Sequence, residues 1–331
     1  MASPVARADR ASHTTARSPT PGPTPASPHQ HASRGAIVAN FAAVYLVWGS
    51  TYLAIRFAIE TLPPLLMAGA RFIVAGALLF LWTMRPGAKR DPGVARLTLS
   101  QIVWGAIVGA LLLVGGNGAV VWGEQRVPSG IVSLLVAVVP IWMVLLDWAR
   151  RGGKRPTPMV VAGLVTGVVG LVILVGPASV GVHAIDRVGA AVVLCGSLSW
   201  AVGSILSKSS RLPRSPIVAT AVEMLAGGVL LVVVGLAGGE LASWSPAAVT
   251  ARSVAAWAYL VVFGSLVGFT AYIWLLGKVS AARVATYAYV NPIVAVFLGW
   301  ALAGEPISAR TMAAAAVIVA AVAMITAGRK S

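Results

Sequence analysis

The chain has 331 residues, of which 58% are hydrophobic and only 10% are charged. A soluble domain cannot bury that much apolar surface, so the composition excludes an ordinary soluble protein and predicts a polytopic membrane protein. The net charge of +16 would also suit a nucleic-acid-binding protein. The basic residues stand in short gaps between apolar runs, however, where membrane topology explains them, so we expect no nucleic-acid partner.

The first region along the chain, residues 1–34, differs from everything that follows it. It is rich in Pro, Ser, Thr and Ala and nearly lacks large apolar residues, so it cannot build a core. It also lacks the short apolar segment of a secretory signal. We predict a disordered tail, with a sensing role as the alternative interpretation.

The remaining chain is a series of long apolar stretches. A helix that crosses the hydrocarbon needs about 20 mostly apolar residues, and the gaps between the stretches carry Pro, Gly or Arg, as turns between antiparallel helices do. The sequence therefore predicts an all-α fold of ten transmembrane helices. We place them at 37–57, 63–84, 100–122, 129–149, 158–176, 188–207, 216–237, 253–276, 281–303 and 307–327.

The distribution of Lys and Arg predicts the orientation of these helices. The tail, the end of the chain and the gaps on their side hold 19 of the 25 basic residues, whereas the opposite gaps hold four and the spans two. Cytoplasmic loops carry the excess of Lys and Arg, so both termini should be cytoplasmic. An even number of spans requires the two termini to share a side, which is an independent argument.

An internal repeat divides the chain into two halves, residues 35–178 and 187–328. One ungapped offset of 152 residues relates the first span of one half to the first span of the other and continues to the fourth. The matched pairs include Trp48 and Trp200, Gly116 and Gly268, Trp122 and Trp274, Pro140 and Pro292, and Trp148 and Trp300. Each half has five predicted helices, and an odd number makes the repeats inverted. Inverted repeats are typical of secondary transporters that open a midplane site alternately to each side.

Pro140 and Pro292 fall at the same depth of equivalent helices. Proline removes a backbone donor, so we predict that each breaks a helix beside the central cavity, where the freed carbonyls can face protein or water. The alternative is an ordinary kink that helps helices pack, since proline is common in membrane helices.

Three stretches resemble the EamA-type members of the drug/metabolite transporter superfamily. They are VWGSTYLAIRFAIETLPPLLMAGARF (47–72), GNGAVVWGEQRVPSGIVSLL (116–135) and TYAYVNPIVAVFLGWALAGEPIS (286–308). The similarity runs from about residue 37 to 327. The resemblance implies two EamA repeats of five helices around a central cavity, in a multi-pass protein of a bacterial cell membrane. It also implies export of small metabolites, amino-acid-like compounds or drugs from the cytoplasm.

Arg71 and Glu223 are charged residues inside predicted spans, and they occupy the same repeat position. Charges at such depth usually face the bundle interior or water and serve function. We predict either an ion pair that forms and breaks as the protein alternates, or an Arg71 that binds a substrate carboxylate while Glu223 carries a coupling proton. A permanent structural salt bridge is the alternative.

Polar and aromatic residues in several spans are candidates for the cavity wall, because a ligand pocket is mostly apolar with a few convergent polar groups. Tryptophan also marks the lipid interface, and Ser, Thr and Asn also join neighbouring helices, so each has a structural alternative. The candidates are Trp48, Ser50, Thr51, Tyr52, Asn117, Trp200, Tyr287, Tyr289 and Asn291.

The residues that catalysis would need are missing from the spans. His13, His29 and His31 lie in the tail and His183 in a loop, and Cys195 is the only cysteine. We therefore expect no enzyme activity, no metal and no cofactor. No phosphate-binding loop is present, so uphill transport must use an ion gradient or exchange.

The sequence thus predicts a secondary exporter of small organic solutes that is coupled to protons. An uncoupled facilitator or exchanger of the same fold is the first alternative. A lipid scramblase ranks lower, because no polar stripe marks a lipid-facing surface. Nothing in the sequence separates a monomer from a homodimer.

Overall fold

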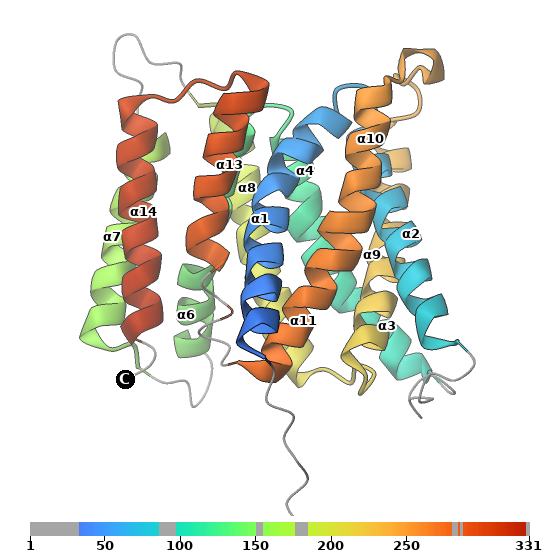
Figure 1. Cartoon of the computed structure of the whole chain (residues 1–331), viewed down its shortest axis with the longest axis horizontal. Helices are drawn as coiled ribbons and strands as arrows, with labels where there is room; N and C mark the ends of the chain where they lie inside the picture. The colour runs from blue at the N-terminus through green and yellow to red at the C-terminus, as the bar shows by residue number, and fades with distance from the viewer. Residues whose placement is uncertain are drawn as a thin grey trace, which may run out of the picture.

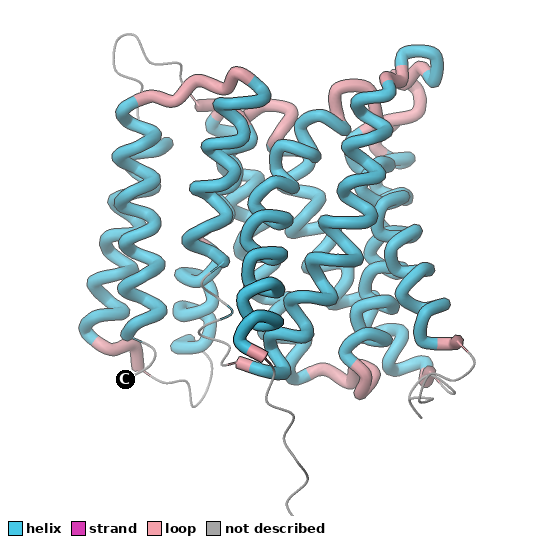
Figure 2. Tube along the Cα trace, viewed as in Figure 1, coloured by secondary structure: helices cyan, strands magenta, loops and turns pink. Residues whose placement is uncertain are grey.

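The computed structural model describes residues 33–85, 97–149, 155–175, 185–279, 284 and 287–328. Within these ranges every regular element is a helix and no strand occurs (Figure 2). The predicted tail, residues 1–34, lies outside the described residues except for its last two. Ser33 accepts a hydrogen bond from the Ala36 N–H and so begins the first helix at Arg34.

The first half of the chain forms eight helical elements. In chain order they are α1 (Arg34–Ala58), α2 (Pro64–Thr83), α3 (Leu99–Gly109), the π-helix η1 (Ala110–Gly118), α4 (Ala119–Gly123), α5 (Ser129–Val136), α6 (Val139–Ala149) and α7 (Pro158–Val175).

The second half contains the counterparts of these elements and a short 3₁₀ turn. They are α8 (Arg187–Ser209), α9 (Pro216–Ala237), the 3₁₀ helix η2 (Pro246–Ala248), α10 (Ala251–Tyr259), the π-helix η3 (Leu260–Val267), α11 (Gly268–Lys278), α13 (Tyr287–Ala303) and α14 (Ala309–Gly328).

Among the described residues, seven helical stretches are long and apolar enough to cross a membrane. They are Arg34–Ala58, Pro64–Thr83, Leu99–Gly123, Ser129–Ala149, Arg187–Ser207, Pro216–Ala237 and Ala251–Tyr272. Three shorter apolar helices accompany them, at Pro158–Leu174, Val290–Ala303 and Ala309–Ile325. Large apolar side chains such as Leu46, Val165 and Leu302 are about 60% exposed on the outside of the bundle. This surface suits lipid rather than water.

The helices stand side by side in one bundle (Figure 1). Its two ends are called the lower end and the upper end, as they lie in Figure 1. The lower end carries the start of α1 and the end of α14, and the upper end carries the α1–α2, α4–α5, α9–α10 and α13–α14 connections. The basic residues described next to the lower-end helix termini are Arg34, Arg85, Arg155, Arg211, Arg214 and Lys278.

Each half packs mainly against the other half. The second helices of the two halves, α2 and α9, form the most extensive contact, and the fifth helices, α7 and α14, form the next one at one side of the bundle (Figure 1). The first helix of each half lies against the third and fourth helices of the other: α1 contacts α10, α11 and α13, while α8 contacts η1, α4 and α6. This reciprocal pattern is that of a two-fold arrangement of repeats, so the two-repeat layout fits the fold.

Close helix approach depends on glycines at the crossing points. A Cβ on Gly69 of α2 would lie 2.8 Å from the Gly228 carbonyl oxygen, and one on Gly228 of α9 would lie 2.9 Å from the Gly69 carbonyl oxygen. Neither distance leaves room for a side chain. Glycine at both positions therefore lets the backbones of α2 and α9 come within contact of each other.

Two helices begin with a carboxylate supplied by the other half. Glu240, just past α9, accepts from the N–H groups of Leu65 and Leu66 in the first turn of α2, at 2.9 Å each. Glu305, between α13 and α14, accepts in the same way at the start of α5. A negative charge at a helix N-terminus satisfies free donors and favours the helix dipole, so both contacts join the halves at the upper end.

The two prolines behave differently. The fourth helix of the first half is interrupted at residues 137–138, between α5 and α6. Pro140 is the second residue of α6. An N–H at that position has no acceptor within the helix, so proline loses no helical hydrogen bond there. In the second half, α13 runs from Tyr287 to Ala303 with Pro292 inside it. The predicted break at Pro292 is therefore corrected: the proline lies within a continuous helix.

Candidate functional site

A cavity of about 130 Å³ lies between the two halves near the middle of the bundle. Both halves contribute to its wall, which is largely apolar and includes Ile55, Phe72, Leu113 and Val120. Most of the predicted site residues line it. These are Trp48, Thr51, Tyr52, Arg71, Asn117, Pro140, Trp200, Tyr287, Asn291 and Pro292.

Two equivalent tryptophans enter the cavity wall across the boundary between the halves. Trp48 of α1 lies against Gly268 of α11, where a Cβ would stand 2.3 Å from the indole Nε1. Trp200 of α8 lies against Gly116 of η1, where a Cβ would stand 2.8 Å from the ring. The four residues are two repeat-related pairs, each made of a tryptophan from one half and a glycine from the other.

The π-helical segments occur in equivalent helices, the third of each half. Their wider turns leave carbonyls that accept side-chain donors from the opposite half. The Leu111 carbonyl in η1 accepts from the Ser199 hydroxyl at 2.8 Å, and the Gly264 carbonyl in η3 accepts from the Trp48 Nε1–H at 3.2 Å. Single π turns inside α-helices are frequent at functional sites, and here both segments border the cavity.

Arg71 is 4% exposed, so its charge is buried in the wall. Its Nε donates to the Ser265 hydroxyl of η3 at 2.9 Å, and its guanidinium lies 4.7 Å from the centre of the Phe72 ring. The Nη1 nitrogen has no hydrogen-bond partner among the described residues. A buried guanidinium with a free donor beside a cavity is suited to an anionic group such as a carboxylate.

Asn117 of η1 supplies a hydrogen-bond acceptor, whereas Arg71 supplies a donor. Its amide oxygen is buried, and none of the described residues donates to it. Asn291, 6% exposed, is engaged instead: with its amide oriented to satisfy both bonds, it donates to the carbonyls of Tyr287 and Tyr45, each at 3.2 Å. Asn291 therefore ties α13 to α1, and Asn117 leaves an acceptor at the cavity.

Aromatic rings gather around Trp48 on the lower side of the cavity. The centre of its indole lies 5.1 Å from Tyr272, 5.2 Å from Tyr287 and 5.5 Å from Phe269. The rings of Trp48, Tyr272 and Tyr287 pack on a buried apolar cluster of α1, α11 and Val284. Ring faces attract cations, so the lower wall suits a positively charged or aromatic part of a solute.

Three predicted residues are not placed in the cavity. Ser50 points elsewhere: its hydroxyl bonds Tyr259 at 2.7 Å and lines a shallow groove on the outside of α1 and α13. Glu223 is half-buried on α9, next to the point where Gly109 of α3 meets the α9 backbone, and no ion pair joins it to Arg71 in the described part of the chain. The side chain of Tyr289 lies outside the described residues.

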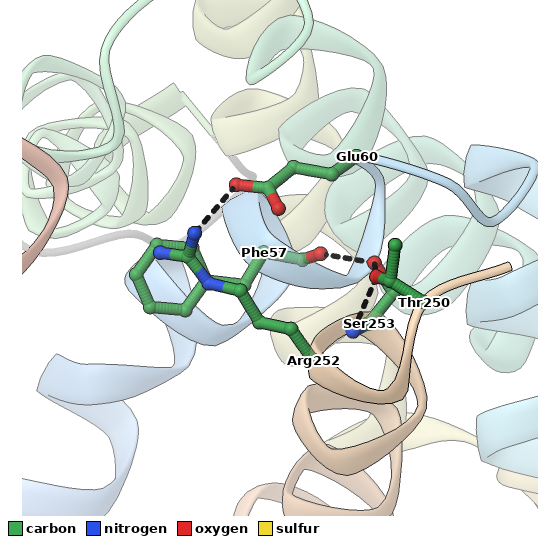
Figure 3. Close-up of polar contacts among 5 residues, drawn as sticks. All are labelled: Phe57, Glu60, Thr250, Arg252 and Ser253. Atoms are coloured by element: carbon green, nitrogen blue, oxygen red, sulfur yellow. Dashed lines mark hydrogen bonds and ion pairs between the residues drawn. The ribbon is translucent and has the colours of Figure 1, made fainter. Parts of the chain in front are cut away.

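The upper end is closed by contacts between the halves. The Ser253 hydroxyl at the start of α10 donates to the Phe57 carbonyl of α1 at 2.8 Å, as Figure 3 shows. In the same figure Arg252 reaches Glu60 at 3.6 Å, and its guanidinium lies 3.6 Å from the centre of the Phe57 ring. Ala58 and Val121 are fully buried nearby.

Glu124, which the sequence analysis passed over, is the other notable residue of the upper end. It follows α4 directly and is 0% exposed. Its carboxylate oxygens have no partner among the residues described, while its backbone carbonyl accepts from Arg56 at 3.0 Å. Hydropathy alone could not find it, because the sequence assigned it to a solvent-facing loop.

Comparisons with known proteins agree with this architecture. Residues 34–176 and 187–327 match the EamA-like transporter family. The uncharacterized inner membrane transporter YedA of Escherichia coli (strain K12) is 40% identical over 288 residues, which cover 87% of this chain and 89% of that protein. The uncharacterized transporter YoaV of Bacillus subtilis (strain 168) is 28% identical over 197 residues, which cover 60% of this chain and 65% of that protein.

A more distant relative carries a functional name. The "Probable amino-acid metabolite efflux pump" of Escherichia coli (strain K12) is 24% identical over 166 residues, which cover 50% of this chain and 51% of that protein. One solved crystal structure shares the fold with a TM-score of 0.59 at 21% identity, covering 90% of this chain and 99% of that chain. With both of its halves matched, the chain belongs to the EamA-like transporter family, and it is a membrane transporter, as its named relatives are.

Proposed function

We propose that the protein is a secondary transporter that exports small amino-acid-like metabolites by alternating access. The observation that carries this proposal is the central cavity, which has a free donor on Arg71 and a free acceptor on Asn117. A cavity between inverted repeats, lined by a few unsatisfied polar groups, is the arrangement expected of a midplane substrate site.

The two free groups favour a zwitterion as the substrate. A substrate carboxylate would pair with the Arg71 guanidinium, and a substrate ammonium would donate to the Asn117 amide oxygen. The rings of Trp48 and Tyr287 offer further contact to a cation. The cavity of about 130 Å³ is smaller than the roughly 300–1,000 Å³ of sites for drug-sized ligands, which favours a small metabolite over a drug.

The membrane topology is part of the same proposal. The seven long apolar helices and the three shorter ones would together make ten spans, in two inverted halves at residues 35–178 and 187–328. The lower end, with its excess of Lys and Arg, would face the cytoplasm together with both termini. Buried contacts between the halves close the upper end, and the lower end would be the side toward which the described conformation opens more readily.

Proton coupling through Glu223 is the finer part of the proposal. A carboxyl within a span can carry a proton across the cycle, and Glu223 is half-buried on α9, the helix that packs against the helix of Arg71. The position of Glu223 away from the cavity wall gives specific support to a second candidate, an uncoupled facilitator or exchanger of the same fold. A homodimer is compatible with both.

The experiment that tests the proposal measures solute flux and pH together. Proteoliposomes with an internal pH dye would be challenged with amino acids, nucleosides and cationic drugs. Wild type would be compared with Arg71→Gln, Glu223→Gln and a matched control, Thr166→Ala. The exposed Thr166 hydroxyl on α7 donates to the Ala162 carbonyl of its own helix and lies outside the cavity wall. Each variant's membrane insertion would be checked first.

The outcomes separate the candidates. Flux of amino acids that Arg71→Gln loses and Thr166→Ala keeps supports the substrate site. A pH change that accompanies flux and is lost in Glu223→Gln supports coupling. Flux without a pH change, equal in wild type and Glu223→Gln, selects the facilitator. Normal amino-acid flux in Arg71→Gln would overturn the site.

A further inference from the structure

Glu124 stands out because it is a fully buried carboxyl that forms no ion pair with any residue the structure describes. It is 0% exposed, and neither carboxylate oxygen has a hydrogen-bond partner within the described ranges. An ionised carboxylate in such surroundings loses its hydration and gains nothing in return. Buried charges of this kind normally become neutral instead.

The groups that face Glu124 from the neighbouring elements reinforce this reading. Burial raises the pKa of the Glu124 carboxyl well above its ordinary value, the Glu305 carboxylate raises it further and Arg56 lowers it. Tyr52 of α1 is the third titratable neighbour. Arg56 gives its hydrogen bond to the Glu124 backbone carbonyl.

Glu305 brings a negative charge close to Glu124, and its own carboxylate is bound by backbone N–H groups of α5. Its two carboxylate oxygens accept from the N–H groups of Ser129 and Gly130 at 2.8 and 3.0 Å, in the first turn of α5. These two N–H groups compensate the Glu305 carboxylate, whereas the Glu124 oxygens receive no hydrogen bond from the described residues. Binding a proton removes the uncompensated charge at Glu124.

Closure of the upper end is what keeps Glu124 dry. Tyr52 and Val120, the latter one helical turn before Glu124, line the cavity below it. Ala58 and Val121 are fully buried on the same level. Any movement that opens the cavity at the upper end has to separate these residues, and it would bring water to the Glu124 carboxyl.

We propose that Glu124 is a proton-binding site that links the closed upper end to protonation. When the upper end closes, the carboxylate takes one proton from the adjoining aqueous phase and becomes a neutral acid. When the upper end opens, water and the Arg56 guanidinium stabilise the carboxylate and the proton returns to that phase. The inference rests on alternating access in the proposed function, and it concerns the gate rather than the transported solute or the proton assigned to Glu223.

The test follows the accessibility of one thiol at the upper end. Cys195, exposed on α8, would be replaced by alanine, and Ala58→Cys would place a single thiol at the closed end of α1. Labelling by a membrane-impermeant maleimide would be measured in sealed vesicles between about pH 5 and pH 9, a range that covers an ordinary and a raised carboxyl pKa. Thiols react faster as they ionise, so each rate would be divided by the rate of a small free thiol at the same pH.

Three proteins are compared. The first is the Cys195→Ala, Ala58→Cys protein, which we call the background. The other two carry Glu124→Gln or, as the matched control, Glu60→Gln in addition. Glu60 is also an upper-end carboxylate, but it is partly exposed and paired with Arg252 at 3.6 Å. We expect labelling of the background to rise with pH. Glu60→Gln loses the pair with Arg252 that helps to close the upper end, so its labelling should be higher at every pH but should keep the same rise. Labelling of Glu124→Gln should stay low and flat. Labelling of Glu124→Gln that rises as in the background, or a background that does not respond to pH, overturns the proposal.

Thermal unfolding in detergent gives a second readout that needs neither substrate nor a gate. Below the pKa of an unfolded glutamate, about 4.3, the carboxyl is protonated in both states. As the pH rises, the unfolded state releases the proton before the folded state does. The folding equilibrium should then fall up to tenfold per pH unit until the raised folded pKa is passed.

Glu124→Gln should make this slope shallower by the share of one proton, and Glu60→Gln should keep the slope of wild type. An identical slope in wild type and Glu124→Gln would place the proton elsewhere and reject the site. Both assays omit the transported solute, so their failure leaves the proposed export activity standing. Loss of amino-acid flux in Arg71→Gln leaves the Glu124 result unaffected in turn.

Discussion

The contact between Gly268 and Trp48 offers a sharp test of how the two halves fit together. Gly268→Ala would place a Cβ 2.3 Å from the Trp48 Nε1 and 2.8 Å from its Cδ1. Both distances are far inside van der Waals contact. The indole cannot simply rotate away, because the rings of Phe269, Tyr272 and Tyr287 pack around it.

The magnitude follows from three terms. Overpacking a tight site costs about 1–3 kcal/mol, and losing the Trp48 bond to the Gly264 carbonyl costs about 1 kcal/mol. Alanine in a helix returns about 1 kcal/mol relative to glycine. The free energy of unfolding should therefore fall by about 1–3 kcal/mol. The control is Gly35→Ala, because no atom lies within 4 Å of its Cβ position.

Unfolding in detergent, followed by heat or by a chemical denaturant, would compare the two variants with wild type. Because the indole also lines the cavity, affinity for the transported solute should fall in Gly268→Ala and stay unchanged in Gly35→Ala. If Gly268→Ala were as stable as Gly35→Ala and bound solute normally, the halves would not depend on this contact, and the argument from glycine would be refuted.

Three further predictions concern other contacts between the halves. Glu305→Gln keeps one acceptor for the first turn of α5 but loses the charge, so unfolding should become easier by about 1–2 kcal/mol; an unchanged melting temperature would contradict this. Ser253→Ala loses the 2.8 Å bond to the Phe57 carbonyl and should destabilise by about 1 kcal/mol in the same assay, whereas no loss would make that bond irrelevant. Arg71→Lys loses the bond from Nε to Ser265 and the planar fork, so equilibrium binding of a carboxylate-bearing solute should weaken by about 10–100-fold; binding equal to wild type would rule out recognition by Arg71.

The helices and the repeat could be predicted from the sequence because each depends on many residues at once. The spans predicted at 63–84 and 216–237 correspond to Pro64–Thr83 and Pro216–Ala237, and a proline at the first position marks the start of both helices. The same offset that pairs Trp48 with Trp200 and Gly116 with Gly268 also held the information for the two tryptophan–glycine contacts. The offset alone does not reveal these contacts, because it cannot be assumed that equivalent residues are neighbours.

Arg71 and Glu223 illustrate why that assumption fails. A two-fold axis exchanges equivalent residues, so the two meet only if they lie on the axis. In the α2–α9 pair, Gly69 meets Gly228, whose repeat counterpart is Gly76. Arg71 therefore lies near the level of Gly228, and Glu223 lies near Met224, which meets Gly76. Both residues therefore lie at the contact between α2 and α9, but at different levels of it, so their side chains do not meet.

Other features depend on single contacts that no local pattern reveals. The π-helical turns of η1 and η3 and the burial of Glu124 follow from what the opposite half presents to them. At Pro292, where a break was predicted, the helix continues from Tyr287 to Ala303. Pro140 and Pro292 occupy the same repeat position, yet Pro140 follows an interruption of its helix and Pro292 lies inside a continuous one.

The reciprocal packing of the halves has a consequence for how the protein is made. Helix α2 has its main partner in α9, and α7 has its partner in α14, so the first half leaves the ribosome without the surfaces that it needs. Those surfaces meet only if the second half enters the membrane in the opposite orientation. In the proposed topology the Lys and Arg of the loops set that orientation, and they would in this sense be determinants of the tertiary structure. Reversing their balance in one half would deprive both halves of their partners at once.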